Sequence, residues 1–103
     1  KIYPDTVSYV IPEKYTFTCI EETRDGRIWA GTVENGIFEI IPGAPHSKIR
    51  RILASSQTFK SNHIQAIHKD RFGFLWIATL EGGVSKYDPI RKEFINYIHN
   101  PRK

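Results

Sequence analysis

Residues 24–37 read Arg-Asp-Gly-Arg-Ile-Trp-Ala-Gly-Thr-Val-Glu-Asn-Gly-Ile, and residues 71–84 read Arg-Phe-Gly-Phe-Leu-Trp-Ile-Ala-Thr-Leu-Glu-Gly-Gly-Val. The types Arg, Gly, Trp, Thr, Glu and Gly recur without a gap, at the offset of 47 that separates Arg24 from Arg71. A sequence period of about 20–50 residues is typical of repeat proteins, in which each unit needs neighbours to cover its apolar faces. The chain is therefore predicted to contain two structural repeats.

Each repeat is predicted to form four short β-strands. β-branched and aromatic residues dominate these stretches. Turn pairs such as Asp25-Gly26 and Asn35-Gly36 separate them, because glycine supplies the positive φ that tight hairpins require. The predicted strands are 17–22, 27–33, 36–41 and 49–54 in the first repeat, and 64–69, 74–80, 83–88 and 93–98 in the second.

The strand at residues 75–80 decides how the sheets are stacked. Leu75 and Ile77 point to one face, and Trp76, Ala78 and Leu80 point to the other, so both faces are apolar. A strand with one wet face would alternate with polar residues, so this sheet is predicted to lie between other layers. Small antiparallel sheets stacked face to face are the blades of a propeller.

The predicted fold is all-β, a β-propeller segment of about two four-stranded antiparallel blades. The segment is predicted to be a single domain over residues 1–103, with blade units at about 15–55 and 62–99. Trp29 and Trp76 are expected to pack in the core between blades. Thr32 and Thr79, three positions after each tryptophan, are expected to bond neighbouring backbone groups.

Composition argues against several classes of function. The 15 Lys and Arg residues exceed the 11 Asp and Glu residues, for a net charge of +4, but the basic clusters are scattered among predicted turns rather than gathered into the stripe that nucleic-acid binding requires. No apolar run approaches the roughly 20 residues of a membrane span, so no membrane contact is expected. The single cysteine, Cys19, is expected to pack as a small apolar residue.

No metal site, cofactor or catalytic residue is expected. His63 and His68 are five positions apart and would lie on opposite faces of a strand, and no cysteine or carboxylate cluster has zinc-like spacing. Glu34 and Glu81 occupy equivalent positions of the two repeats. A hydrolytic carboxylate pair at these positions is the less favoured alternative to two solvated turn residues.

These stretches resemble the two-component-regulator propeller repeat, which runs Asp, two residues, Gly, an apolar residue, Trp-Ile-Gly-Thr, a glycine pair, an apolar residue and Tyr-Asp. The first repeat departs from it, with Thr23 in place of the Asp and Ile40-Ile41-Pro42 in place of Tyr-Asp-Pro. The resemblance covers residues 14–99. The second repeat matches at Asp70-Arg71-Phe72-Gly73, Leu75-Trp76-Ile77-Ala78-Thr79, Gly82-Gly83-Val84 and Tyr87-Asp88-Pro89.

The resemblance implies a function in signalling. In that family the repeats build the extracytoplasmic, periplasmic sensor region of membrane-anchored hybrid histidine kinases, which often respond to carbohydrates. The chain would then be a non-enzymatic part of a propeller that detects a carbohydrate-derived ligand and relays the signal to a histidine kinase. A propeller scaffold that binds other proteins, and part of a propeller glycosidase or polysaccharide lyase, remain as alternatives.

Six residues are candidates for ligand contact because loops at one end of a blade gather together. Glu34, Asn35 and Glu81 lie in the loops between the second and third strands. Lys60, Asn62 and His63 lie in the connection that enters the second repeat and are expected at the same end.

Two blades do not close a ring, since propellers typically have about four to eight. An apolar blade face is therefore expected to stay open at both ends of the pair. The predicted partners are other blades of the same propeller, if the chain is a segment of a longer one, or further copies of the chain, if several copies complete a ring. An oligosaccharide is the predicted ligand.

Overall fold

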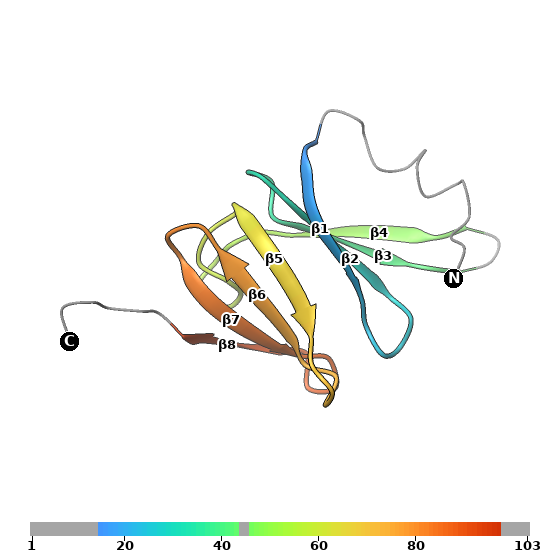
Figure 1. Ribbon diagram of the computed structural model, residues 1–103. Coiled ribbons are helices and arrows are strands. Elements are labelled where there is room, and N and C mark those ends of the chain that lie inside the picture. Colours follow the sequence, from blue (N-terminus) through green and yellow to red (C-terminus); the bar gives the residue numbers. More distant parts are fainter. Residues whose placement is uncertain (1–14, 44–45, 98–103) are drawn as a thin grey trace.

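The computed structural model describes residues 15–43 and 46–97, and in this part of the chain eight strands form two antiparallel sheets of four strands each (Figure 1). Neighbours in sequence are neighbours in each sheet, as in a propeller blade. The first blade consists of β1 (Phe17–Glu22), β2 (Ile28–Thr32), β3 (Ile37–Ile41) and β4 (Lys48–Ile52). The second blade consists of β5 (Ile64–Lys69), β6 (Leu75–Thr79), β7 (Gly83–Asp88) and β8 (Glu93–Tyr97). The predicted all-β fold class is confirmed.

The repeat extends to the details of the backbone. Gly26 and Gly73 have φ angles of 88° and 92°, so each hairpin turn uses the left-handed conformation that glycine tolerates. The register of β1 on β2 shifts between Phe17 and Cys19, and that of β5 on β6 shifts at the equivalent place, between Ile64 and Ala66. Thr32 Oγ1 donates a hydrogen bond to the Gly36 carbonyl, and Thr79 repeats this bond to Gly83, as predicted.

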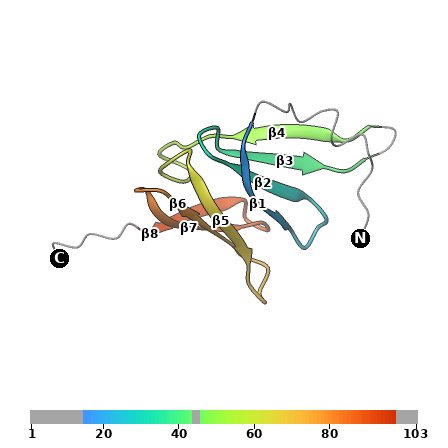
Figure 2. The same cartoon turned by 45° about the horizontal axis from the view of Figure 1, so that its top comes forward.

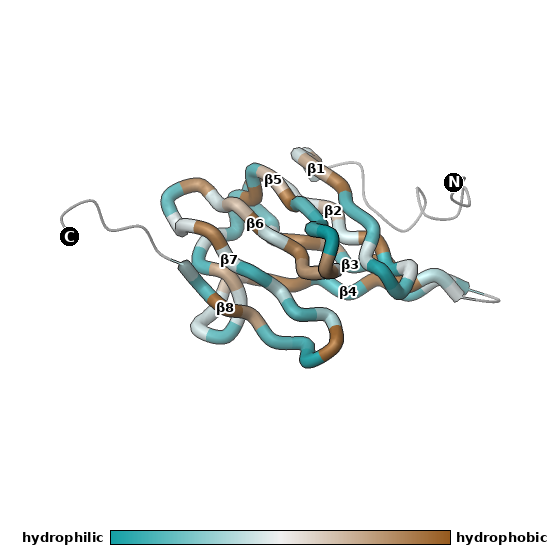
Figure 3. Tube along the Cα trace, turned by 60° about the horizontal axis from the view of Figure 1, so that its bottom comes forward, coloured by the Kyte–Doolittle hydropathy of each residue, from teal (hydrophilic) through white to brown (hydrophobic). Residues whose placement is uncertain are grey.

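The two blades face each other, with β1 beside β5 (Figures 1 and 2). Polar bonds also cross between the blades: Thr18 Oγ1 donates to the Ile64 carbonyl over 2.6 Å, and the Arg24 guanidinium donates to the Arg71 carbonyl. Hydrophobic segments run through the strands near the middle of the molecule, and most turns are hydrophilic (Figure 3).

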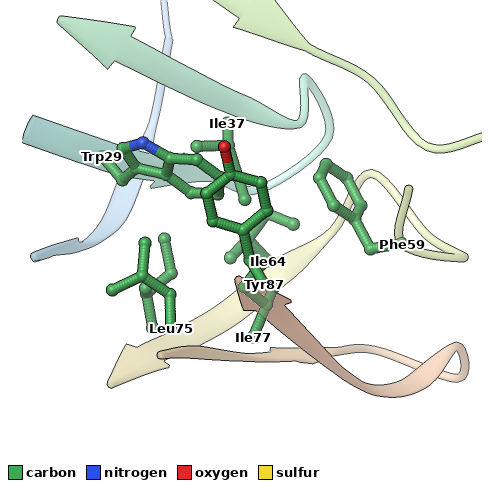
Figure 4. Packing of buried hydrophobic residues seen from close by; sticks show 8 residues of the cluster. Trp29, Ile37, Phe59, Ile64, Leu75, Ile77 and Tyr87 are labelled. Atoms are coloured by element: carbon green, nitrogen blue, oxygen red, sulfur yellow. The ribbon is translucent and has the colours of Figure 1, made fainter. Parts of the chain in front are cut away.

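The core lies between the two blades and is built from the side chains of both. Trp29 and Ile37 of the first blade meet Leu75, Ile77 and Tyr87 of the second, and all five are at most 5% exposed (Figure 4). The rings of Trp29 and Tyr87 lie 4.6 Å apart between centroids, which is close aromatic contact. Burial of these faces against each other stabilises the pair of blades.

Trp76 does not lie in this core, although its sequence position is equivalent to that of Trp29. It is half-buried on the face of the second blade that points away from the first, where its ring stacks on Tyr97 at 5.8 Å. Leu80 and Val84 nearby are 43% and 37% exposed. The expectation that both tryptophans lie between blades is therefore wrong for Trp76, because each tryptophan points toward the following blade and the described residues contain no third blade.

The outward face of the first blade is buried at its centre, and Ile20 at its β1 edge is 65% exposed. Ile28, Ala30 and Ile40 are 2%, 5% and 1% exposed, and the Tyr15 and Phe17 rings pack on Phe38 at 5.0 and 6.0 Å. The expectation of an open apolar face at both ends is thus wrong at the first blade. It is right only at the second.

The two blades satisfy the tryptophan indole in different ways. Trp76 Nε1 donates to Asp70 over 2.8 Å, and Asp70 also accepts from the backbone of the turn. These bonds, the one from Trp76 first, hold the pKa of Asp70 below its ordinary value. The first blade has Thr23 in place of Asp70, and Trp29 Nε1 instead donates to Glu39 over 3.0 Å.

Glu39 is a buried carboxylate, only 1% exposed, and it is fully paired. Arg50 lies 2.7 Å from one of its oxygens and Arg27 lies 3.4 Å from the other. Glu39 carries its negative charge into the interface, where it affects Tyr87 of the second blade. Burial raises the pKa of Tyr87, and the negative charge of Glu39 raises it further. Pairing with two guanidiniums makes this burial tolerable.

Candidate functional site

The six candidate residues lie at one end of the two blades, where the loops β2–β3 and β6–β7 and the connection from β4 to β5 gather (Figure 1). Gly36 N, in the first loop, donates to the Asn62 carbonyl over 3.0 Å. Leu80 N, at the second loop, donates to the His63 carbonyl over 2.9 Å. These bonds place the connection against both loops, as predicted from the sequence.

Asn62 serves to hold this end of the molecule together. Its side-chain oxygen accepts from Ala54 N over 2.7 Å, while its carbonyl accepts from Gly36. A Cβ built on Gly36 would lie 2.3 Å from the Ile52 carbonyl oxygen and 3.3 Å from Asn62 Oδ1, so only glycine fits there. Asn62 therefore positions the loop through both of its carbonyl oxygens.

The β6–β7 loop lies directly on the connection. A Cβ on Gly82 would come within 2.9 Å of Ser61 Cβ and 3.1 Å of the Lys60 carbonyl carbon. The preceding residue, Glu81, takes the left-handed conformation with φ of 65°. Glu81 and Lys60 are both exposed and belong to segments in contact, so an acceptor and a donor are available at one surface.

The remaining candidates complete a polar surface. Glu34 is exposed, and Asn35 and His63 are half-buried. Asn35 N donates to Thr32 Oγ1 over 2.8 Å, which fixes the loop. Carboxylates, an ammonium group and an amide offer several donors and acceptors for a polyhydroxylated ligand. Within residues 15–43 and 46–97, no group of three or more His, Cys, Asp or Glu side chains is arranged to hold a metal ion.

A pocket that the sequence reasoning missed lies at the opposite end of the blades. Its volume is about 320 Å³, and turn residues of both blades line it, including Arg24, Phe72, Ile90 and Arg91. Phe72 and Ile90 are 65% and 91% exposed. Large apolar residues in turns were the available signal, because turns favour small polar residues.

A second pocket, of about 380 Å³, lies at the outer edge of the blades. Arg50, Arg51, Lys92 and Phe94 are among the residues that line it. Neither pocket includes any of the six candidates. The predicted site is therefore a loop surface, and the two pockets are separate features.

The repeated four-stranded sheets, joined through a shared apolar core, define the class: a pair of β-propeller blades. The family model described as two component regulator propeller matches residues 11–34 and 58–81. The two matched segments begin 47 positions apart, at residues 11 and 58, and each overlaps one blade, so both blades resemble repeats of this family. No curated protein sequence matches the chain.

A solved structure supports the same architecture. The chain is similar to a crystal structure of the extracellular domain of a protein described as a one-component system, from B. thetaiotaomicron, with a TM-score of 0.63 and 25% sequence identity. The match covers 85% of this chain and 12% of that one. Among the residues that the structure describes, no helix has the length and apolarity needed to cross a membrane.

Proposed function

We propose that the chain is part of an extracytoplasmic sensor propeller that detects a carbohydrate-derived ligand and relays its binding to a histidine kinase. The observation that carries the proposal is the pair of regulator propeller repeats in a fold similar to part of an extracellular domain. The proposal gives this segment no catalytic step. Further blades of the same repeat are the proposed partners that complete the ring.

The loop end with the six candidates is the proposed ligand surface. Lys60, Glu34 and Glu81 are exposed there, and they come from two adjacent blades and the segment that joins them. A ligand that contacts all three would link the blades, so its binding energy would act on the relative position of the blades. Such a difference in affinity between two arrangements is what a sensor needs.

The experiment uses the full-length parent protein and a panel of defined oligosaccharides. Binding is measured by calorimetry for the parent and for its Lys60→Ala and Glu81→Gln variants. Loss of a hydrogen bond to a charged group is expected to weaken binding by about 10-fold or more. Asn62 is avoided, because its substitution would disturb the loop itself.

Glu93→Gln is the matched control. Glu93 is also an exposed glutamate but lies in β8, on an outer strand, so its substitution is expected to leave binding unchanged. Ligand-dependent autophosphorylation of the parent then tests the relay to a histidine kinase. Release of shortened sugar would instead favour the glycosidase or lyase alternative, and binding of proteins without any saccharide would favour the scaffold.

A further inference from the structure

The face of the second blade that points away from the first is apolar and open. Val84, Ile95 and Tyr97 are 37%, 48% and 46% exposed, and Trp76 is half-buried among them. Register pairing places Val84 opposite Tyr97 and Trp76 opposite Lys86, so these side chains share one face of the sheet. Contiguous apolar surface of this kind marks an interaction site.

The same face of the first blade shows what covers it. Ile37 pairs with Ile52 there, in the register that Val84 and Tyr97 repeat. Ile37 is fully buried and Ile52 packs against the core, because the second blade lies on them. The open face is therefore the next copy of an interface that the chain already contains.

We infer that this face docks a further blade of the same repeat, one that carries a residue smaller than isoleucine at the place of Ile64 and a carboxylate facing Lys86. The inference rests on the proposed completion of the ring by further blades, and it adds which blade fits. Two differences between the faces carry it, one of shape and one of charge.

The shape differs where the neighbouring blade comes closest. On the first face, a Cβ built on Gly31 would lie 2.6 Å from Ile64 Cγ2 and 2.9 Å from Ile64 Cβ. Ile64 is fully buried and fits only because Gly31 has no side chain. On the second face Ala78 replaces Gly31, so its methyl group fills the space that an isoleucine would need.

On the strand beside it, the side chain becomes smaller from the first blade to the second. Cys19 Sγ would lie 2.7 Å from a Cβ on Gly31, and the second blade has Ala66 where the first has Cys19. The second face thus gains a methyl group over β6 and loses a sulfur atom over β5. The larger side chain is Cys19, in β1, on the first face, and the added methyl group is that of Ala78, in β6, on the second. The same neighbouring blade therefore cannot fit both faces equally well.

The charge is inverted. The first face carries Glu39 opposite Trp29, whereas the second carries Lys86 opposite Trp76. Lys86 Nζ lies 5.4 Å from the Trp76 ring and 4.8 Å from the Phe74 ring, and in the described part of the chain no carboxylate lies within ion-pair distance of it. Covering an unpaired ammonium group is costly, so the occupant must bring a carboxylate.

A second copy of the chain does not meet these requirements. The face it would present is that of its first blade, where Ile28 and Ile40 are already buried. That blade also carries Phe17, which is larger than isoleucine, at the place of Ile64. The occupant is therefore a blade of different sequence.

The test inserts a third blade, a copy of residues 53–97, between Tyr97 and residue 98, so that the β4–β5 connection is repeated and no residue is lost. Acrylamide quenching of tryptophan fluorescence reports docking, because in the wild-type chain Trp29 is fully buried and only Trp76 is accessible. The inserted copy is made unaltered, with Ile64→Ala, and with Ile64→Ala and Tyr87→Glu. Tyr87 is chosen because it contacts Trp29 and senses Glu39 across the first interface. The copy's own Trp76 is replaced by phenylalanine in all three.

Quenching of Trp76 is expected to persist with the unaltered copy, to fall with Ile64→Ala and to be lost with the double substitution. An Ala78→Gly change in the host chain is expected to reduce quenching with the unaltered copy as well, because it reopens the space for isoleucine. Equal protection by all three copies would overturn the size and charge requirements. Quenching that persists in every version would overturn the docking of a blade here. Because neither ligand nor kinase enters the assay, its failure is separate from failure of the sensor proposal.

Discussion

Gly31→Ala is the sharpest single test of how the two blades fit. The added methyl group would lie 2.6 Å from Ile64 Cγ2 and 2.7 Å from Cys19 Sγ, inside van der Waals contact. Ile64 is fully buried and cannot swing away into solvent. Overpacking of this kind costs about 1–3 kcal/mol, and restriction of the unfolded chain by alanine returns about 0.4–1, so a net loss of about 1–2 kcal/mol is expected.

Urea denaturation followed by circular dichroism measures this loss as a lower midpoint with an unchanged slope. A second variant, Cys19→Ala, separates the two contacts. Combined with Gly31→Ala, it reproduces the Ala66 and Ala78 pair of the second blade and removes the clash with sulfur. The double variant is expected to be more stable than the sum of the single losses by at least about 0.5 kcal/mol. A Gly31→Ala midpoint equal to that of the wild type would refute the close approach of the blades.

Three further predictions concern the polar groups of the blades. Glu39→Leu is expected to lower the free energy of unfolding by about 1–3 kcal/mol more than Glu39→Gln, because only leucine leaves the buried indole N–H of Trp29 unpaired; equal urea midpoints would contradict this. The pKa of Asp70 is lowered in the folded state, so the stability that its carboxylate contributes is present above the ordinary value of 3.8 and is lost as the pH falls through the lowered value. Asp70→Asn should therefore reduce the fall of the urea midpoint between about pH 6 and about pH 2. Since the pKa of Tyr87 is raised, the stability it supports is intact below its ordinary value of 10.0 and is lost as the pH rises through the raised value; Tyr87→Phe should abolish this alkaline loss, and an unchanged pH profile would count against burial of the hydroxyl.

The strand order and the blade boundaries follow from local information. Alternating apolar residues and turn glycines such as Gly26 and Gly73 are sufficient to predict each hairpin, because they fix backbone conformation within a few residues. The sequence predicts the outermost strand of the first blade less well, at 49–54, whereas the strand runs over Lys48–Ile52. It has exposed arginines and pairs on one edge only, so its pattern is weak.

What covers each blade face could not be read from the strands alone. Trp29 and Trp76 occupy equivalent positions of the two repeats, yet one is fully buried and the other is half-buried. The difference comes from the neighbouring blade, which lies 47 positions along the chain for Trp29. The same limit applies to the candidate site. The sequence predicts the loop end, but the hydrogen bonds of Asn62 within it depend on Gly36, which belongs to the first blade, and on the path of the chain from Ala54.

The two repeats keep the same bonds while exchanging the residues that make them. Thr23 Oγ1 accepts a hydrogen bond from the backbone N–H of Arg27, as Asp70 Oδ1 does from that of Phe74. Asp70 has a second oxygen that accepts from the Trp76 indole, whereas Thr23 has one hydroxyl, so the Trp29 indole needs another acceptor. The carboxylate is therefore found on β3, as Glu39, in the blade that lacks Asp70. This exchange moves a buried negative charge onto one blade face and leaves a lysine on the other. Backbone geometry thus makes the blades alike enough to stack, while the position of one carboxylate makes their faces different enough to specify which blade follows which.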